Sequence, residues 1–274
     1  MKSMHPGPAN TAPPDAPESL EDDDMTPLLS EPFARAWAAP AEPGRLAERL
    51  SGRLQRSLEA ERGMVTVRRR QAAFESPAPG VRTRTLYRAP PERALRPGEP
   101  RRACVIELLA GSRLQWLAAG PVEVLVLQGQ AQVDGEALGL RDFLLMPAGP
   151  VGLASESGAE LFVREAQGDV QRTLLRDADA GWPEFAPGIR RRVLWAADGQ
   201  AALLYRAEPG AAVPGHGHGH DEECLMVEGE LFLDDLLLQQ GDYQLAPAGS
   251  GHRITQTDTG VIIYAHGDLD LQFT

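Results

Sequence analysis

Four side chains in the C-terminal third of the chain have the types and spacing of a metal site. The segment PGHGHGHDEECLMVEG places His216 and His218 two positions apart and Glu222 four positions further on. Side chains two apart on a β-strand project from the same face, so both imidazoles can point at one centre. Glu222 would return on the next strand after a tight turn, and His252, which follows the turn PAGSG, would complete the set.

Three imidazoles and one carboxylate define the class of metal. Such ligands suit zinc, iron(II), manganese, nickel or copper, and the set contains no thiolate that would favour a softer ion. Five of the six histidines fall between residues 216 and 266, which argues against a chance His-x-His on the surface. His220 is expected to be a solvent-facing turn residue, with the alternative that it replaces His218. We therefore expect one divalent metal ion per chain.

Several residues near the predicted metal site could take part in reactions there. On the strand that carries the glutamate ligand, Cys224 and Met226 would also point inward, and a thiol and a thioether near a metal are oxidisable. Tyr243, Tyr264 and His266 are further candidates to surround the metal, or they belong to the core or rim of the fold. The sequence contains no GxSxG nucleophile motif and no Walker-type phosphate loop. The catalytic residues therefore stay unassigned, and any chemistry must take place at the metal.

Short strands are predicted throughout the chain after residue 64. Runs of Val, Leu and Ile alternate with polar residues and are interrupted by Gly or Pro about every 8–12 residues, which is typical of an all-β sandwich or barrel. Residues 122–149 also align without a gap on residues 222–249, and a shared motif precedes each copy. This duplication predicts two tandem antiparallel β-barrels of the jelly-roll type, at 64–168 and 169–274.

The two copies differ at every position of the metal set. At the four ligand positions, in order, the first copy carries Trp116, Ala118, Val122 and Gly152. The turn residues of the two copies coincide, whereas none of these four side chains is a metal ligand. The first barrel is therefore expected to keep the fold and to bind no metal.

The N-terminal region is expected to lie outside both barrels. Residues 1–41 are rich in Pro, Ala and acidic side chains, which predicts a disordered tail. Residues 42–63 are predicted to form one amphipathic helix. The apolar stripe of this helix consists of Leu46, Leu50, Leu54 and Leu58. The stripe would pack on the following barrel, or it would dock on a partner or a second subunit.

The composition limits the partners and the compartment. A formal net charge of −12 opposes binding to phosphate backbones, and the arginine runs 68–70 and 190–192 are interpreted as outward-facing charge beside strands. The only cysteines, Cys104 and Cys224, have no metal or disulfide spacing, which fits a reducing compartment. The chain shows no signal-peptide pattern and no apolar stretch of about 18 residues. We expect a cytoplasmic protein without nucleic-acid or membrane partners.

The order of these motifs resembles the cupin superfamily. The pattern G-x5-HxH-x3-E-x6-G begins at Gly210 and is followed by G-D-x4-P and a late histidine. The segment HGHGHDEECLMVEGELFLDD with PAGSGH is similar to the metal-binding cupin domain of ChrR-type anti-sigma factors, in which the equivalent His, His, Glu and His hold zinc. The resemblance implies a bicupin arrangement and favours zinc over iron, manganese or nickel. The zinc-binding helical domain of those proteins, with His-x3-Cys-x2-Cys, has no counterpart here.

Two classes of function follow. The first is a ChrR-like regulatory, stress-sensing or accessory protein, in which the metal barrel responds to a small-molecule ligand or an oxidant. A sigma factor or another regulatory protein would then be the partner. The second is a metal-dependent cupin enzyme, such as an Fe(II) dioxygenase or a small-molecule isomerase. Because the edge strands of cupin-like barrels commonly pair, we also expect a homodimer.

Overall fold

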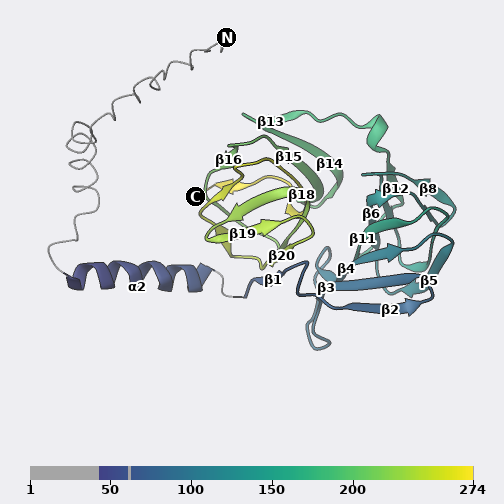
Figure 1. Ribbon diagram of the computed structural model, residues 1–274, viewed down its shortest axis with the longest axis horizontal. Coiled ribbons are helices and arrows are strands. Elements are labelled where there is room, and N and C mark those ends of the chain that lie inside the picture. Colours follow the sequence, from purple (N-terminus) through teal and green to yellow (C-terminus); the bar gives the residue numbers. More distant parts are fainter. Residues whose placement is uncertain (1–42, 61–62, 274) are drawn as a thin grey trace, which may run out of the picture. The chain divides into compact units, whose positions relative to one another are not determined.

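The computed structural model of the protein describes residues 43–60 and 63–273, so the predicted disordered tail at 1–41 lies outside the described residues. Helix α2 (Pro43–Ala60) falls within the range predicted for the amphipathic helix (Figure 1). All four leucines of its stripe are exposed, the least exposed being Leu46 at 44%. The role of this stripe stays a prediction. Among the described helices, none has the length and apolar character needed to span a membrane.

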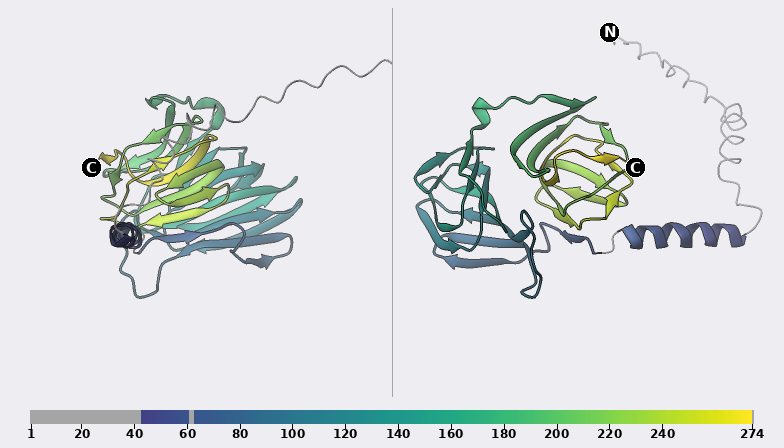
Figure 2. Two further views of the ribbon diagram at one scale, coloured as in Figure 1. Left: turned by 60° about the vertical axis from the view of Figure 1, so that its left-hand side comes forward. Right: turned by 180° about the vertical axis from the view of Figure 1, so that it is seen from behind.

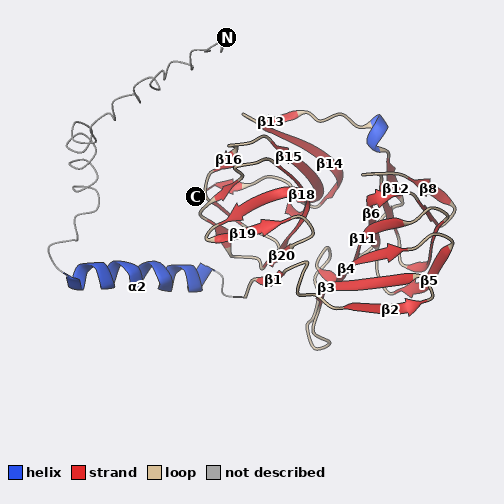
Figure 3. Cartoon of the chain, viewed as in Figure 1, coloured by secondary structure: helices blue, strands red, loops and turns tan. Residues whose placement is uncertain are grey.

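The remaining regular structure of the described residues consists of strands and one short 3-10 helix, η1 (Asp177–Asp179) (Figure 3). The strands up to η1 are β1 (Val65–Val67), β2 (Phe74–Ala78), β3 (Val81–Arg88), β4 (Pro100–Leu108), β5 (Ser112–Ala118), β6 (Val122–Gly129), β7 (Ala131–Val133), β8 (Glu136–Leu138), β9 (Phe143–Met146), β10 (Gly149–Ser155), β11 (Ala159–Ala166) and β12 (Thr173–Leu175).

The strands after η1 repeat much of this pattern. They are β13 (Glu184–Ala186), β14 (Ile189–Ala197), β15 (Gln200–Ala207), β16 (Ala212–Val213), β17 (His216–Gly217), β18 (Glu222–Leu233), β19 (Leu236–Gln239), β20 (Tyr243–Ala246), β21 (Gly251–His252), β22 (Thr255–Gln256), β23 (Val261–Asp268) and β24 (Gln272–Phe273).

These strands form two antiparallel barrels, as predicted (Figure 2). In the first barrel, a seven-stranded sheet (β12-β9-β6-β11-β4-β3-β2) packs on a four-stranded sheet (β5-β10-β7-β8). Apolar side chains of both sheets, such as Val124, Leu153 and Leu161, fill the interior between them. The second barrel contains a ten-stranded sheet and a three-stranded sheet (β21-β17-β24). Its apolar interior includes Met226 and Leu238.

The edge strands are exchanged between the two barrels. Strand β1 pairs with β20, so residues 65–67 extend the large sheet of the second barrel, although the sequence assigned them to the first. Strand β12 pairs with β9, so residues 173–175 extend the first barrel instead of the second. Each exchange gives hydrogen-bond partners to a strand that would otherwise be an unpaired edge. The domain boundary read from the repeat therefore does not follow the strand pairing.

The two large sheets also pack against each other through a shared apolar core. This core joins Leu125 and Phe162 of the first barrel to Leu225 and Tyr264 of the second. The rings of Phe162 and Tyr264 are in contact, with centroids 4.9 Å apart. The interface therefore resembles a domain interior and fixes the two barrels together.

A buried polar cluster lies within this interface. Arg164 donates to Glu123 from Nη1 (2.7 Å) and to Glu223 from Nε. The phenol of Tyr264 donates to Glu123 (2.5 Å), and that of Tyr243 donates to Glu223 (2.6 Å). Burial disfavours the charged guanidinium, but the two carboxylates outweigh this effect and raise the pKa of Arg164. One arginine of the first barrel thus links a glutamate from each barrel.

Candidate metal centre

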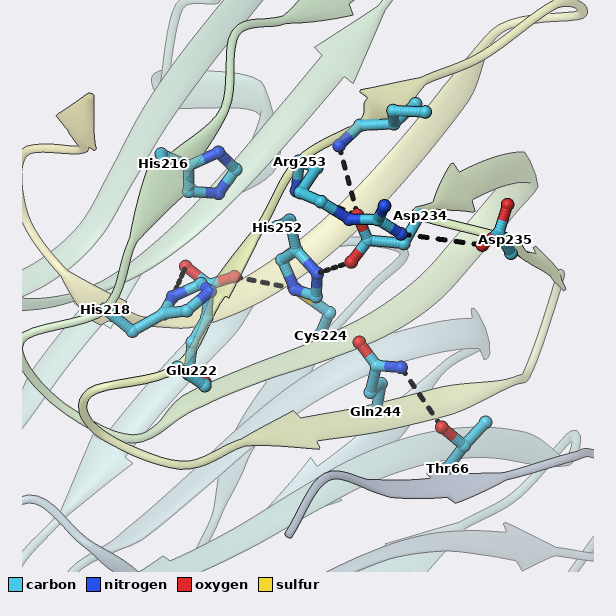
Figure 4. A network of polar contacts seen from close by, with 12 residues as sticks. Thr66, His216, His218, Glu222, Cys224, Asp234, Asp235, Gln244, His252 and Arg253 are labelled. Atoms are coloured by element: carbon cyan, nitrogen blue, oxygen red, sulfur yellow. Dashed lines mark hydrogen bonds and ion pairs between the residues drawn. The ribbon is translucent and has the colours of Figure 1, made fainter. Parts of the chain in front are cut away.

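The structure brings His216, His218, Glu222 and His252 together at one point of the second barrel (Figure 4). The centroids of the three imidazoles lie 5.0, 5.4 and 5.8 Å apart. One ligand atom from each of His216, His218 and Glu222 lies within 4.8 Å of the other two. All three histidines are buried. His216, His218 and Glu222 are therefore compact enough to surround a single ion, and the ring of His252 lies beside them.

Short strands and a fixed turn position these side chains. His216 on β17 lies directly opposite His252 on β21, so the two rings start from paired positions. Glu222 is the first residue of β18, where the chain re-enters the large sheet. The turn between β17 and β18 is held by Asp268, whose Oδ2 accepts the backbone N–H of Gly219 (2.6 Å). Glycine at this turn lets the chain pass close to Asp268.

Two of the imidazoles are oriented by oxygen atoms on their Nδ1 side. Nδ1 of His252 lies 3.3 Å from Oδ2 of Asp234, and Nδ1 of His216 lies 3.1 Å from the carbonyl oxygen of Pro214. The other oxygen of Asp234 accepts the backbone N–H of Arg253 (2.8 Å), which fixes the carboxylate. A carboxylate or carbonyl that accepts a hydrogen bond from Nδ1–H leaves Nε2 as the metal-binding nitrogen.

The surroundings of His218 indicate whether a metal ion fits this group. Its Nε2 is buried and has no hydrogen-bond partner, a costly arrangement that a bound cation would relieve. Burial disfavours its charged form, but the carboxylate of Glu222, 3.3 Å from Nδ1, raises the pKa of His218. Burial alone would raise the pKa of Glu222, yet the bond to His218 and the nearby imidazoles lower it to about 2. An ionised carboxylate among three imidazoles fits a divalent cation.

A cavity inside the second barrel opens onto this group. Its volume is about 60 Å³, and it is bordered by His216, Glu222 and His252 together with mostly apolar side chains. The hydroxyl of Thr255 also borders it and has no hydrogen-bond partner. Burial raises the pKa of Tyr205, another lining residue, to about 12, so its phenol stays protonated. A site that opens onto a cavity can take a small ligand in addition to its protein ligands.

Cys224 and Met226 point inward, as the strand alternation predicted. The Sγ atom of Cys224 borders the cavity and lies 3.6 Å from Oε1 of Glu222. Burial raises the pKa of this thiol well above its ordinary value, and the charge of Glu222 acts in the same direction. Cys224 is therefore a neutral thiol that contacts a candidate ligand. Met226 lies deeper, in the apolar interior of the barrel.

The other candidates from the sequence lie away from the metal group. Tyr243 and Tyr264 bond the buried carboxylates between the barrels, and His266 stacks on Trp195 with its Nε2 3.4 Å from Glu123. Glu223, the partner of Tyr243, follows Glu222 directly, so the two glutamates point to opposite faces of β18. His220 lies in the turn next to Asp268, as expected, with its side chain 41% exposed.

The structure corrects one of the equivalences in the first barrel. Asp134 Oδ1 accepts the N–H of Gly152 (2.7 Å), whereas Asp234 Oδ1 accepts the N–H of Arg253. Leu153 pairs with Val133 as Thr255 pairs with Leu233, so Gly152 corresponds to Ile254 and not to His252. The cause is that the first copy has two residues fewer after the shared Pro-Ala-Gly turn. Val151 is buried in the apolar interior, and the absence of metal from the first barrel stays a prediction.

Asp234 contacts the candidate metal group but was not among the residues predicted from the sequence. It coincides with Asp134 in the repeat, and both adopt positive φ angles (54° and 47°), which marks them as turn residues. A turn role alone explains a repeated Asp, so no sequence pattern indicates that Asp234 also contacts His252. The histidine contact becomes visible only when β21 is placed beside this turn.

Replacing Asp234 with asparagine is expected to weaken metal binding about 10–100-fold, because the carboxylate orients His252 and increases its basicity. Asparagine tolerates the positive φ, so the turn should survive. Competition against a chromophoric chelator measures the change in affinity. Asp134→Asn makes the same substitution at the matching turn of the first barrel and should leave the affinity unchanged. An equal loss in both variants would contradict the role of Asp234.

Comparison with known proteins agrees with this geometry. Residues 170–270 match the sequence model of a family described as the ChrR cupin-like domain. No curated protein matches the chain. Among solved structures, a proposed dioxygenase from Nostoc punctiforme is similar with a TM-score of 0.60 and 13% identity, covering 76% of this chain and 84% of that one.

Two further solved structures are oxalate decarboxylases. The Bacillus subtilis enzyme, in a two-residue deletion mutant, gives a TM-score of 0.55 at 15% identity, covering 74% of this chain and 76% of that one. The Lactobacillus farciminis enzyme in complex with formate gives 0.55 at 14% identity, covering 76% and 87%. At this level of identity the similarity shows the fold. Each of these structures covers about three quarters of the chain, so the chain shares their overall fold.

Proposed function

We propose that this protein is a ChrR-like metal-binding bicupin with a regulatory or stress-sensing role. His216, His218, Glu222 and His252 would hold one divalent ion, with zinc as the favoured metal. The observation that carries the proposal is the opening of this group onto a small cavity that Cys224 also borders. The match of residues 170–270 to the ChrR cupin-like family supports the regulatory reading.

The contacts around Cys224 suggest how such a centre would respond. A molecule entering the cavity would meet Glu222 and the thiol of Cys224 together, since these two side chains are in contact. Thiols react with oxidants as thiolates, and burial keeps this one protonated. The signal is therefore proposed to be a small ligand that reaches the metal. The response would pass to a homodimer partner or another regulatory protein in the cytoplasm.

The second candidate is a metal-dependent enzyme of the dioxygenase or isomerase class. The open side of the metal group favours it, because catalytic metal sites keep a position free for substrate whereas structural sites are closed. The ion would supply a Lewis acid or bind oxygen. The cavity offers few polar groups besides the metal ligands, and its tyrosine stays protonated. Acid–base chemistry without the metal therefore has little support.

Elemental analysis and oxygen uptake together separate the two candidates. The full chain would be purified without added metal, its metal content measured, and oxygen consumption recorded with β-diketones and catechols. About one tightly held zinc per chain without turnover supports the sensor. Iron with substrate-dependent oxygen uptake would overturn the sensor proposal and support the enzyme. Light scattering of the same sample measures whether the chain is a dimer.

A further inference from the structure

The chain builds the same junction twice, each time where the segment preceding one barrel meets a turn of the other. In the first case, Asp142 accepts the backbone N–H of Asp177 (2.8 Å) and a side-chain N–H of the arginine before it. In the second, Asp242 accepts the backbone N–H of Arg69 (2.8 Å) and a side-chain N–H of the arginine before it. Arg69 therefore occupies the backbone position that Asp177 occupies in the other junction. We call these the Asp177 junction and the Arg69 junction.

Each junction covers one buried arginine of the adjoining sheet. Arg192 on β14 lies at the Asp177 junction, and Arg84 on β3 lies at the Arg69 junction; both are at least 96% buried. The two arginines occupy the same position of the repeated motif P-G-[VI]-R-x-R-x-L. Each guanidinium also faces an aromatic ring, Trp182 at 4.3 Å for Arg192 and Phe74 at 5.6 Å for Arg84. The main difference between the two sites lies in the groups that neutralise the arginine.

At the Asp177 junction the buried guanidinium is fully satisfied. Arg192 donates from Nη1 to the carboxylate of Asp177 (2.5 Å), from Nε to the carbonyl of Gly181 (3.1 Å) and from Nη2 to the carbonyl of Ala180 (2.6 Å). All three nitrogens thus have partners, and one of these partners carries a negative charge. A buried charge with this arrangement needs no further ligand.

At the Arg69 junction the equivalent guanidinium lacks these partners. Arg84 donates from Nη1 to the carbonyl of Arg69 (3.3 Å), but its Nε and Nη2 have no hydrogen-bond partner. The nearest carboxylate oxygen, on Glu160, lies 4.0 Å from Nη2. Burial lowers the pKa of Arg84, which indicates that the surrounding acids do not compensate for desolvation. The substitution of Arg69 for an aspartate removes a negative charge and adds a positive one.

An open pocket lies at this junction. Its volume is about 810 Å³, and its walls include Arg84, Phe74, the arginines 68–70 and residues of the turn before β20. The two acids in the wall are already engaged: Glu107 pairs with Arg82, and Asp242 holds the backbone of the junction. Within residues 63–273, Arg69 and Arg70 form no ion pair. The pocket therefore carries positive charge that the protein leaves uncompensated.

We propose that this pocket binds an oxyanion, the phosphate or carboxylate group of a small metabolite, which supplies beside Arg84 the negative charge that Asp177 supplies at the other junction. Nε and Nη2 lie on one edge of the guanidinium, and two parallel N–H groups on that edge match two oxygens of a carboxylate or phosphate. Arg69 and Arg70 would add charge around the bound group. In a chain with a net charge of −12, such a local positive site concentrates anions selectively.

Titration calorimetry of the full chain with inorganic phosphate and, separately, with succinate tests the proposal. We expect saturable binding of at least one anion with a Kd of about 1 mM or lower. Arg69→Asp restores the acid of the other junction, so it should reduce affinity at least about tenfold and raise the melting temperature. Arg84→Gln should also abolish binding. Phosphate-only or succinate-only saturation identifies which oxyanion the pocket selects.

Arg113→Asp is the matched control for charge. Arg113 is exposed on β5 of the first barrel, so this variant changes the net charge as Arg69→Asp does but leaves the pocket intact. Its affinity should stay within about twofold of the wild type. The proposal is overturned if neither anion gives saturable heat with the wild type. It is also overturned if Arg69→Asp binds as well as the wild type, since binding would then occur elsewhere, including at the metal.

Discussion

Replacing Arg164 with alanine is expected to lower the free energy of unfolding by about 3–5 kcal/mol. The variant leaves Glu123 and Glu223 buried between the barrels without the cation that they share. Burial already raises the pKa of Glu123, and Arg164 is the main opposing influence. After its removal, at least one of the two carboxylates must take up a proton or draw in water. Both responses disrupt a core that also contains the contact between Phe162 and Tyr264.

Urea unfolding followed by tryptophan fluorescence and circular dichroism measures this effect. Arg113→Ala serves as the control, because this arginine is exposed on β5 and its loss should change the free energy by no more than about 0.5 kcal/mol. In Arg164→Ala, fluorescence and circular dichroism should also give different unfolding midpoints if the barrels come apart before they unfold. A loss below about 1 kcal/mol would contradict the central role of Arg164 in the interface.

The barrel architecture could be predicted because duplication and strand alternation are both local patterns in the sequence. Residues 122–149 and 222–249 show the same turns and the same alternation, and they form matching strands. The exchange of β1 and β12 could not be predicted in this way. A short run such as 65–67 has the same composition whichever sheet it extends. Its partner is set by packing between the barrels, which lies outside any local pattern.

The buried polar cluster shows a second limit of the sequence. Glu123 and Arg164 lie at alternate positions of apolar strands, where a charged residue normally indicates a solvent-facing side. Here that side faces the other barrel, and the charges neutralise each other across the interface. The same alternation places Glu222 and Glu223 on opposite faces. Sequence alone identified the first as a candidate metal ligand, while the role of the second depends on Arg164 in the other half of the chain.

The metal group was the feature most easily predicted from the sequence, because three of its four ligands are concentrated in one segment. His216, His218 and Glu222 lie within seven residues, so their relation depends on local strand and turn geometry. His252 required only one further strand pairing, which the structure supplies directly opposite His216. The contact of Asp234 with His252 and the cavity both depend on how several strands close into a barrel, so residue spacing in the sequence does not predict them.

Removing a single candidate ligand is expected to produce the largest functional effect. His216→Ala and Glu222→Ala should each reduce metal affinity by more than about a hundredfold, because each removes a donor from a group that already holds a buried, unpartnered nitrogen on His218. Metal content after dialysis against a weak chelator measures the loss. Circular dichroism of the same samples checks that the barrels remain folded, so that loss of metal is not a consequence of unfolding.

The duplicated barrel provides the control for this experiment. Trp116→Ala alters the position that corresponds to His216, and it should leave the metal content at about one ion per chain. Wild-type protein that holds two ions per chain would contradict the difference between the barrels. Retention of metal by both His216→Ala and Glu222→Ala would show that the ion binds elsewhere. Loss in these two variants with retention in Trp116→Ala would assign the single site to the second barrel, where the cavity gives a small ligand access to it.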